Sequence, residues 1–121
     1  MLKSLAFALA TSVSLVAVPP AHAASGCGVA SHYGVGDGFG WRTMANGRPM
    51  NPSAMITAHP WLPLGSRVQV TNRSNGASVV VKVTDRGPYA GGRILDLSYG
   101  AFSQIANPSR GVANVCYTRI S

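Results

Sequence analysis

Glutamate is absent from this sequence, and its three acidic residues are Asp37, Asp85 and Asp96. Chemistry that needs a carboxylate side chain must therefore use one of these three. Two of them would be required to hydrolyse a sugar bond with a carboxylate pair, and a calcium or magnesium cage built of carboxylates is not expected. Charged residues make up only 11% of the 121 residues, whereas 46% are hydrophobic. This balance is typical of one small folded domain and not of a disordered segment.

The beginning of the chain has the features of an export signal. A lysine precedes an apolar run over residues 5–18, and Ala21-His22-Ala23 is a small-x-small cleavage site. The run is too short for a membrane span, so no transmembrane segment is expected. We predict a signal peptide over residues 1–23, cleavage after Ala23, and a folded domain over residues 24–121 in the periplasm or cell envelope.

Cys27 and Cys116 are the only cysteines and lie near the two ends of this domain. In an exported protein, two cysteines favour a disulfide. Closing a loop of about 90 residues would stabilise the fold by roughly 4 kcal/mol in the chain-entropy model. The alternative is a lipid anchor on Cys27, because Ala24-Ser25-Gly26-Cys27 is similar to a lipoprotein cleavage box. A larger aliphatic residue is expected in place of Ala24, and an anchor would leave Cys116 unpaired, so we expect the disulfide.

Metal ligands and clustered charges are both scarce. Within residues 24–121 only His32 and His59 could serve as nitrogen ligands, and no Cys-x-x-Cys or His-x-x-x-His spacing occurs, so no metal or other cofactor is expected. Nine Lys and Arg against three Asp give this segment a net charge of +6. The basic residues are scattered singly, which together with the export signal argues against a nucleic-acid partner.

Strand patterns dominate the domain. Alternating valines over residues 67–71 and 78–84 flank Asn75-Gly76, which predicts a β-hairpin. Ser98 can cap a helix over residues 99–106. Further strands are expected over residues 29–33, 93–97 and 112–120, and residues 53–58 could form a short helix or a strand. About six strands and one helix favour a small closed barrel over an open sheet.

Five short motifs follow one another through nearly the whole domain. They read ASHYG at residues 30–34, TMANG at 43–47, AHPWLPLGSRV at 58–68, VVVKVTDRGPY at 79–89 and GRILDLS at 92–98. This ordered set closely resembles the rare lipoprotein A family of bacterial envelope proteins. The resemblance implies an all-β fold, a six-stranded double-psi β-barrel with one short helix, as in expansins and barwin-like proteins.

The resemblance also implies an activity. Characterised members are endolytic peptidoglycan transglycosylases, which are lyases that cut naked glycan strands and leave 1,6-anhydro-muramic ends. Peptidoglycan glycan strands are thus the expected partner, with division-site proteins as further candidates, and a charge of +6 suits this polyanion. The alternative is a non-catalytic, expansin-like module that binds peptidoglycan.

Asp85 and His59 match the functional positions of the family. Asp85 would protonate the glycosidic oxygen and then act as a base, because the nucleophile comes from the substrate. His59 would orient Asp85 or bond a sugar hydroxyl, unless it only anchors its loop. Asp96, in the middle of a strand, is expected to be structural and paired with Arg93 or Arg86.

One departure bears on catalysis. The family has glutamate, a proposed catalytic acid, where this chain has Arg48. This replacement favours the binding-module alternative, whereas the other motifs favour the enzyme. The side chains expected to contact substrate are Arg48, Tyr33, Trp61, Arg86 and Tyr89.

Overall fold

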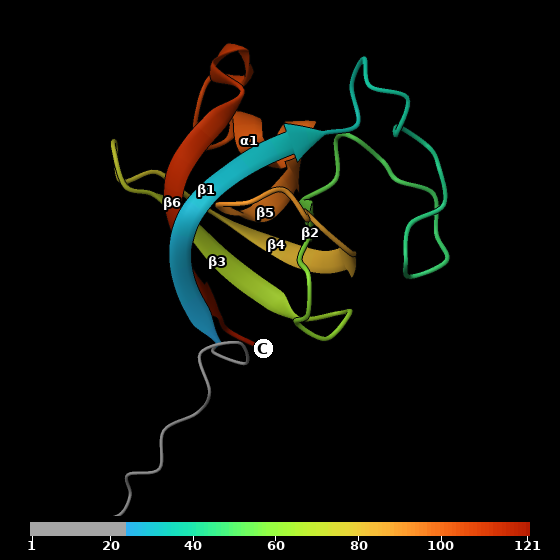
Figure 1. Ribbon diagram of the computed structural model, residues 1–121, viewed down its shortest axis with the longest axis horizontal. Coiled ribbons are helices and arrows are strands. Elements are labelled where there is room, and N and C mark those ends of the chain that lie inside the picture. The colour runs from blue at the N-terminus through green and yellow to red at the C-terminus, as the bar shows by residue number, and fades with distance from the viewer. Residues whose placement is uncertain (1–23) are drawn as a thin grey trace, which may run out of the picture.

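The computed structural model describes residues 24–121, which form a closed barrel of six strands in the order β1-β5-β2-β4-β3-β6 (Figure 1). The strands are β1 (Ser25–Tyr33), β2 (Ile56–Ala58), β3 (Arg67–Asn72), β4 (Ser78–Asp85), β5 (Arg93–Ser98) and β6 (Val112–Arg119), joined by the helix α1 (Tyr99–Ser103) and the 3-10 turn η3 (Pro108–Arg110). The predicted all-β barrel with one short helix is confirmed. The predicted signal peptide lies outside the described residues.

Two parallel strand pairs give the barrel its topology. β1 pairs in parallel with β5, and β2 pairs in parallel with β4, while the other four pairings are antiparallel. Residues 53–58, which the sequence left open, provide the three-residue strand β2 between β4 and β5. Because of this interleaving, the ends of β1 and β4 lie close together although they are far apart in sequence.

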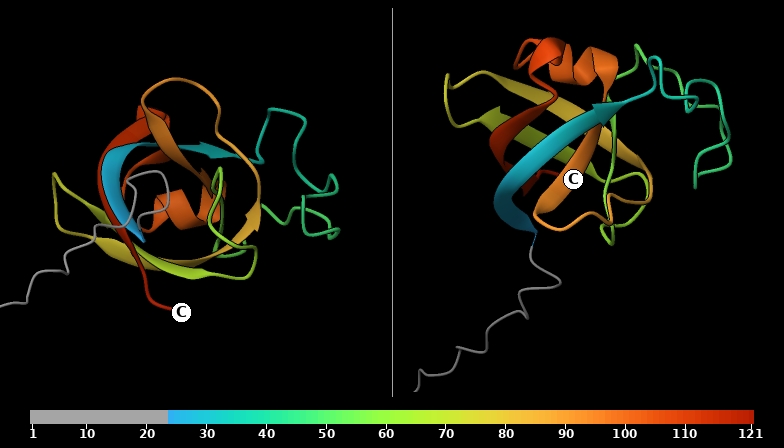
Figure 2. Two further views of the ribbon diagram at one scale, coloured as in Figure 1. Left: turned by 60° about the horizontal axis from the view of Figure 1, so that its bottom comes forward. Right: turned by 45° about the horizontal axis from the view of Figure 1, so that its top comes forward.

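Along the strands, buried aliphatic side chains that face the interior of the barrel alternate with side chains that face outward. Val68 and Val70 of β3 face inward with Val81 and Val83 of β4, and all four are almost fully buried. Phe102 of α1 is completely buried in the same core, where α1 covers one end of the barrel (Figure 2). Each such side chain contributes roughly 1.5–3 kcal/mol on leaving water, so this cluster holds the fold together.

The helix is shorter than predicted. Ser98 caps it as expected, since its hydroxyl accepts from the N–H of Ala101 at 3.0 Å, but α1 ends at Ser103. The carbonyl of Ile105 instead accepts hydrogen bonds from the side chains of Asn72 and Asn75. Asn107 has an extended backbone because the ring of Pro108 disfavours a helical conformation at the residue before it. The helix therefore cannot continue to the proline.

The long connection between β1 and β2 packs against the outside of the barrel. Met44 and Met50 of this loop form a second buried cluster with Tyr33, Ile56 and Ala58. Tight packing at the start of the loop requires glycine, because Gly34 has φ +107° and a Cβ there would lie 2.7 Å from Met50. The loop is therefore held to the barrel wall beside the end of β1.

Cys27 and Cys116 form a disulfide between directly opposed positions of β1 and β6. The predicted pairing is confirmed, and a sulfur atom in a disulfide cannot also carry a lipid. Within residues 24–121 there is no helix with the length and apolar character needed to cross a membrane.

Candidate functional site

Asp85 is the last residue of β4, and its half-buried carboxylate receives three hydrogen bonds. The hydroxyl of Tyr33 donates to Oδ2 at 2.9 Å, and the main-chain N–H groups of Ala45 and Arg86 donate to Oδ1 at 2.9 Å each. The turn at residues 43–47 reaches this position because the N–H of Asn46 also donates to the carbonyl of Thr84, at 3.1 Å. Three motifs of the sequence thus meet at one carboxylate.

Tyr33, the last residue of β1, orients this carboxylate through its hydroxyl. Its side chain is 8% exposed, and burial, together with the neighbouring Asp85 carboxylate, raises the pKa of the Tyr33 phenol. A phenol that stays protonated can only donate to the carboxylate. The sequence suggested Tyr33 as a substrate contact, and the structure adds this bond to Asp85.

His59 is buried, and both nitrogens of its ring are occupied. Nδ1 accepts from the main-chain N–H groups of Trp61 at 3.1 Å and Leu62 at 3.0 Å, and Nε2 lies 3.0 Å from the hydroxyl of Tyr117. Because Nδ1 is an acceptor, the proton of the neutral ring is on Nε2. Burial, and secondarily the charge of Arg86, lowers the pKa of His59 to about 4. The ring is therefore neutral near pH 7 and leaves no nitrogen for a sugar hydroxyl.

The main chain links His59 to the candidate acid. Its N–H donates to the carbonyl of Asp85 at 3.1 Å, and its own carbonyl accepts from Nη1 of Arg86 at 3.1 Å. The same Nη1 donates to the carbonyl of Leu62 at 2.6 Å. Arg86 therefore fixes the loop at residues 59–62 against the end of β4, and its charge is used there rather than to pair with Asp96.

A pocket of about 230 Å³ opens in front of Asp85. Its walls include Tyr33 and Arg86, as well as two residues of the β1–β2 loop that the sequence did not single out, Phe39 and Arg42. Phe39 stacks edge-on to Tyr33 with ring centroids 6.2 Å apart, and the Arg42 guanidinium lies 5.7 Å from the Phe39 ring. The glycines at every second position of residues 34–40 indicate a loop, but they do not indicate which of its side chains line a pocket.

A second hollow of about 520 Å³ adjoins the first, since Met44 lines both. Arg48 and Lys82 lie on its wall. Arg48, which stands where the resemblance leads us to expect glutamate, thus shares this hollow with a second cationic side chain. Of the other predicted substrate contacts, Tyr89 is 80% exposed just beyond β4, and Trp61 packs edge-on to His59 with centroids 4.7 Å apart.

Asp96 lies on β5, across the strand pair from β1. The hydroxyl of Ser31 donates to its Oδ1 at 3.1 Å, so a serine rather than the expected arginine makes its side-chain hydrogen bond. Burial raises the pKa of Asp96, against the opposing effects of the Ser31 bond and of Arg93. The charges of Asp85, Asp96 and Asp37 all help to raise the pKa of the Tyr33 phenol.

In the part of the chain from residue 24 onward, no three His, Cys, Asp or Glu side chains gather in a group that could hold a metal ion. What the geometry offers is one rigidly held carboxylate in a pocket, with aromatic and cationic side chains around it.

Comparison with known proteins gives these features a context. A family model described as "Lytic transglycolase" matches residues 25–117. A relative from Nostoc sp., "Probable endolytic peptidoglycan transglycosylase RlpA", is 53% identical over 88 residues, which are 73% of this chain and 24% of the relative. The chain thus spans about a quarter of the length of that relative.

Solved structures share the barrel. The Streptomyces papain inhibitor superposes with a TM-score of 0.62 and 26% identity, covering 80% of this chain and 94% of the inhibitor. The apo form of an expansin from Clavibacter michiganensis gives a TM-score of 0.61 and 26% identity, covering 80% of this chain and 50% of the expansin.

Proposed function

The chain belongs to the lytic transglycolase family, and on this premise we propose that its barrel is a peptidoglycan lytic transglycosylase that cuts naked glycan strands. The observation that carries the proposal is Asp85, a family-matched carboxylate held by three hydrogen bonds on the wall of a pocket. A single carboxyl group suffices for this reaction, unlike hydrolysis with inversion, which needs a second carboxylate to activate water.

The proposed reaction uses Asp85 twice. The carboxylic acid form gives its proton to the oxygen that bridges N-acetylmuramic acid and N-acetylglucosamine, and the glycosidic bond breaks. The 6-hydroxyl of the muramic acid attacks its own anomeric carbon, and its proton returns to the Asp85 carboxylate. The products are a 1,6-anhydro-muramic end and a free N-acetylglucosamine end, and no water is consumed.

His59 would then contribute by position and not by proton transfer. A neutral ring with both nitrogens bonded fixes residues 59–62, and its main chain bonds Asp85 and Arg86. The exposed rings of Phe39, Trp41 and Tyr89 are suited to stacking on sugars. Arg48 and Lys82 would attract carboxylates of the glycan.

Tyr33→Phe tests whether the hydrogen bond from Tyr33 to Asp85 contributes to catalysis. The change keeps the ring but removes the hydroxyl that donates to Asp85. Because a hydrogen bond to a charged group is worth about 1.5–3 kcal/mol, its loss should lower kcat by about 10- to 100-fold. KM should change little, and the pH–rate profile should shift to higher pH because the carboxylate loses a donor. Kinetics with denuded glycan strands across a pH series measure both effects. An unchanged profile would show that Tyr33 serves only in packing.

Arg48→Glu decides between the enzyme and the module. Restoring the family's usual acid should raise the release of anhydro-muramic ends, by up to about 10²-fold for an added acid or base. Mass spectrometry of denuded glycan strands after incubation measures the product. Arg73→Glu makes the same charge change on an exposed turn outside both hollows, and we expect no gain from it. Product from Arg48→Glu but none from wild type would identify the natural protein as a glycan-binding module on an inactive site.

The non-catalytic module is the second candidate, and one observation favours it. Arg48 and Lys82 give the hollow beside Asp85 two cations where the family has an acid. Such a surface would hold glycan by charge and stacking without cutting it. Absence of anhydro-muramic ends after prolonged incubation with denuded strands, together with retained binding, would establish this function.

Export is part of the same proposal. A substrate in the cell wall requires an exported protein, and a disulfide suits an oxidising compartment. We infer secretion by the signal peptide, cleavage after Ala23, and action of the barrel at residues 24–121 in the periplasm or envelope. An interaction with division-site proteins stays a prediction from the family resemblance.

A further inference from the structure

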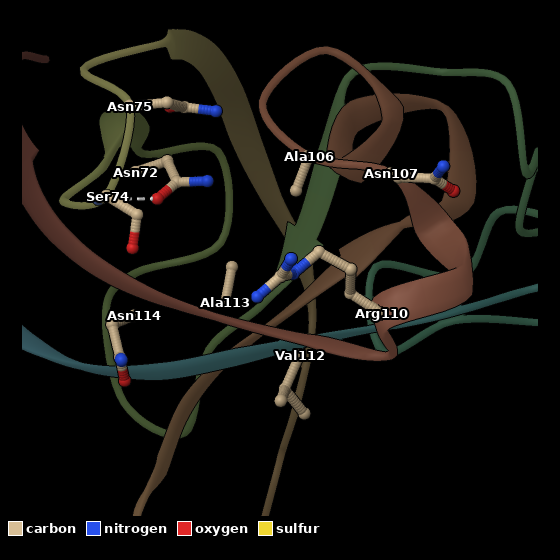
Figure 3. A pocket seen from close by; sticks show the side chains of 9 residues that line it. All are labelled: Asn72, Ser74, Asn75, Ala106, Asn107, Arg110, Val112, Ala113 and Asn114. Atoms are coloured by element: carbon tan, nitrogen blue, oxygen red, sulfur yellow. Dashed lines mark hydrogen bonds between the residues drawn. The ribbon is translucent and has the colours of Figure 1, made fainter.

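A third pocket, of about 350 Å³, is lined by other residues than the two hollows near Asp85 (Figure 3). It is enclosed by the β3–β4 hairpin, the chain between α1 and η3, and the start of β6. Four asparagines, one serine and one arginine line it, with two alanines and a valine. No motif of the candidate active site includes these side chains, so the pocket needs an explanation of its own.

Two of the asparagines form a fixed wall. Nδ2 of Asn72 and Nδ2 of Asn75 both donate to the carbonyl of Ile105, at 2.8 and 3.0 Å. Their Oδ1 atoms accept from the N–H groups of Ser74 and Ala77. Each carboxamide is therefore oriented before any ligand arrives, with its oxygen engaged and a second hydrogen left on its nitrogen.

Arg110 supplies the charge. Its guanidinium makes no hydrogen bond or ion pair with any residue from 24 to 121, and the same holds for the side chains of Ser74 and Asn114. Figure 3 shows the Arg110 side chain extending from the η3 turn toward Ala113. A guanidinium offers five N–H donors and no acceptor. Donors thus exceed acceptors in the pocket, which suits a ligand with negatively charged oxygen atoms.

Among residues 24–121, no carboxylate shares the pocket with this arginine. Asp85 stands at the other end of β4 from the hairpin. Seven residue steps along a strand correspond to about 23 Å. Along β4, Asp85 therefore lies more than one Debye length, about 8 Å at physiological ionic strength, from the hairpin wall of the pocket. Asp96 is separated from the β6 wall by β1 and bonds Ser31.

We propose that this pocket binds a carboxylate group of the cell wall, an inference that rests on the function proposed above. Arg110 would hold both carboxylate oxygens, which is the geometry a guanidinium favours, and the amide nitrogens of Asn72 and Asn75 would donate from the opposite wall. The methyl groups of Ala106 and Ala113 would lie against a short alkyl group beside the carboxylate. A single guanidinium matches the single charge of a carboxylate.

Two sources in peptidoglycan carry this chemistry, the lactyl group of muramic acid and the carboxylates of the stem peptide. NMR titration of the oxidised ¹⁵N-labelled protein can separate them with three small probes. N-acetylmuramic acid has the lactyl carboxylate, N-acetylglucosamine lacks it, and N-acetyl-D-alanine represents the peptide. We expect a carboxylate probe to shift the amide signals of Ser74, Arg110 and Asn114, and N-acetylglucosamine to leave them in place.

Arg110→Gln should weaken this binding by about tenfold or more, because a charge-assisted hydrogen bond is lost. Arg119→Gln is the matched control, since it removes the same charge from the other end of β6, where Nε of Arg119 bonds only the carbonyl of Ser121. Ser74→Asp should also abolish binding by placing a carboxylate beside Arg110. All three positions are exposed, so the barrel should retain its melting temperature.

Each outcome has a defined meaning. Shifts with N-acetylmuramic acid alone support the lactyl source, and shifts with N-acetyl-D-alanine alone support the stem peptide. Shifts with both support a pocket that accepts either carboxylate. If neither carboxylate probe shifts the signals, or if Arg110→Gln binds them with the affinity of wild type, the proposal is overturned. Formation of anhydro-muramic ends is measured separately, so carboxylate binding without product would support this inference and reject only the proposed enzyme.

Discussion

Replacement of Asp85 by asparagine is expected to lower the turnover of denuded glycan strands by about 10²–10⁴-fold, the usual contribution of a general acid. The carboxamide keeps the shape of the side chain, and its oxygen can still accept from the N–H groups of Ala45 and Arg86. Asparagine cannot give a proton to the glycosidic oxygen, so catalysis is lost while the pocket persists. Mass spectrometry of anhydro-muramic ends measures turnover, and cosedimentation with insoluble peptidoglycan measures binding, which should be nearly unchanged.

The absence of glutamate makes this experiment unusually decisive. If wild type and Asp85→Asn release product at equal rates, the acid must be Asp37 or Asp96, because the chain has no other carboxylate side chain. Asp37 receives the N–H groups of Gly34 and Phe39 in an open loop, whereas Asp96 is half-buried beside Ser31. Asp37→Asn and Asp96→Asn would then identify which of the two replaces Asp85.

Reduction of the disulfide should have the largest effect on stability. Cys27 and Cys116 are 89 positions apart, and the chain-entropy model assigns about 4 kcal/mol to a loop of that length. For a domain of this size, 1 kcal/mol shifts the melting temperature by about 4–8 °C, so reduction should lower it by on the order of 20 °C. Thermal unfolding with and without a reducing agent measures the shift.

Two controls accompany the melting experiment. The Cys27→Ala/Cys116→Ala double variant should melt at the lower temperature whether or not a reducing agent is present. The intact mass of the non-reduced protein should be two hydrogens below that of the reduced protein. A diacylglyceryl mass on Cys27, or equal melting temperatures in both states, would contradict the assigned role of the disulfide.

The β3–β4 hairpin could be predicted from sequence because its signal is local. Alternating valines and an Asn-Gly turn lie within a few residues of one another, and the structure pairs Val68 with Val81 and Val70 with Val79. The β1–β2 loop offers no such period. Its position depends on Met44 and Met50 packing against Tyr33, a contact between distant residues that local patterns do not encode.

The candidate site shows the same limit. The motif around Asp85 predicts a functional residue at this strand end. It does not reveal that the bond with Tyr33 spans 52 positions, or that Ala45 contributes only its main-chain N–H. From sequence alone, His59 is expected to lie in a loop and to be able to titrate. Its hydrogen bond with Tyr117, 58 positions away, and its burial make it neutral, and only the fold reveals this.

Pairing of the first and last strands determines how the barrel can be attached to other polypeptides. The N–H of Arg119 donates to the carbonyl of Ala24 at 2.8 Å, so the chain enters and leaves the fold at adjacent points (Figure 1). Tyr33 and its pocket lie at the opposite end of β1. A tether fused at either point would attach to the end of the barrel away from Tyr33 and leave the pocket at Asp85 uncovered. Because its two ends are adjacent, the barrel can be inserted into a longer polypeptide at one place without covering this pocket.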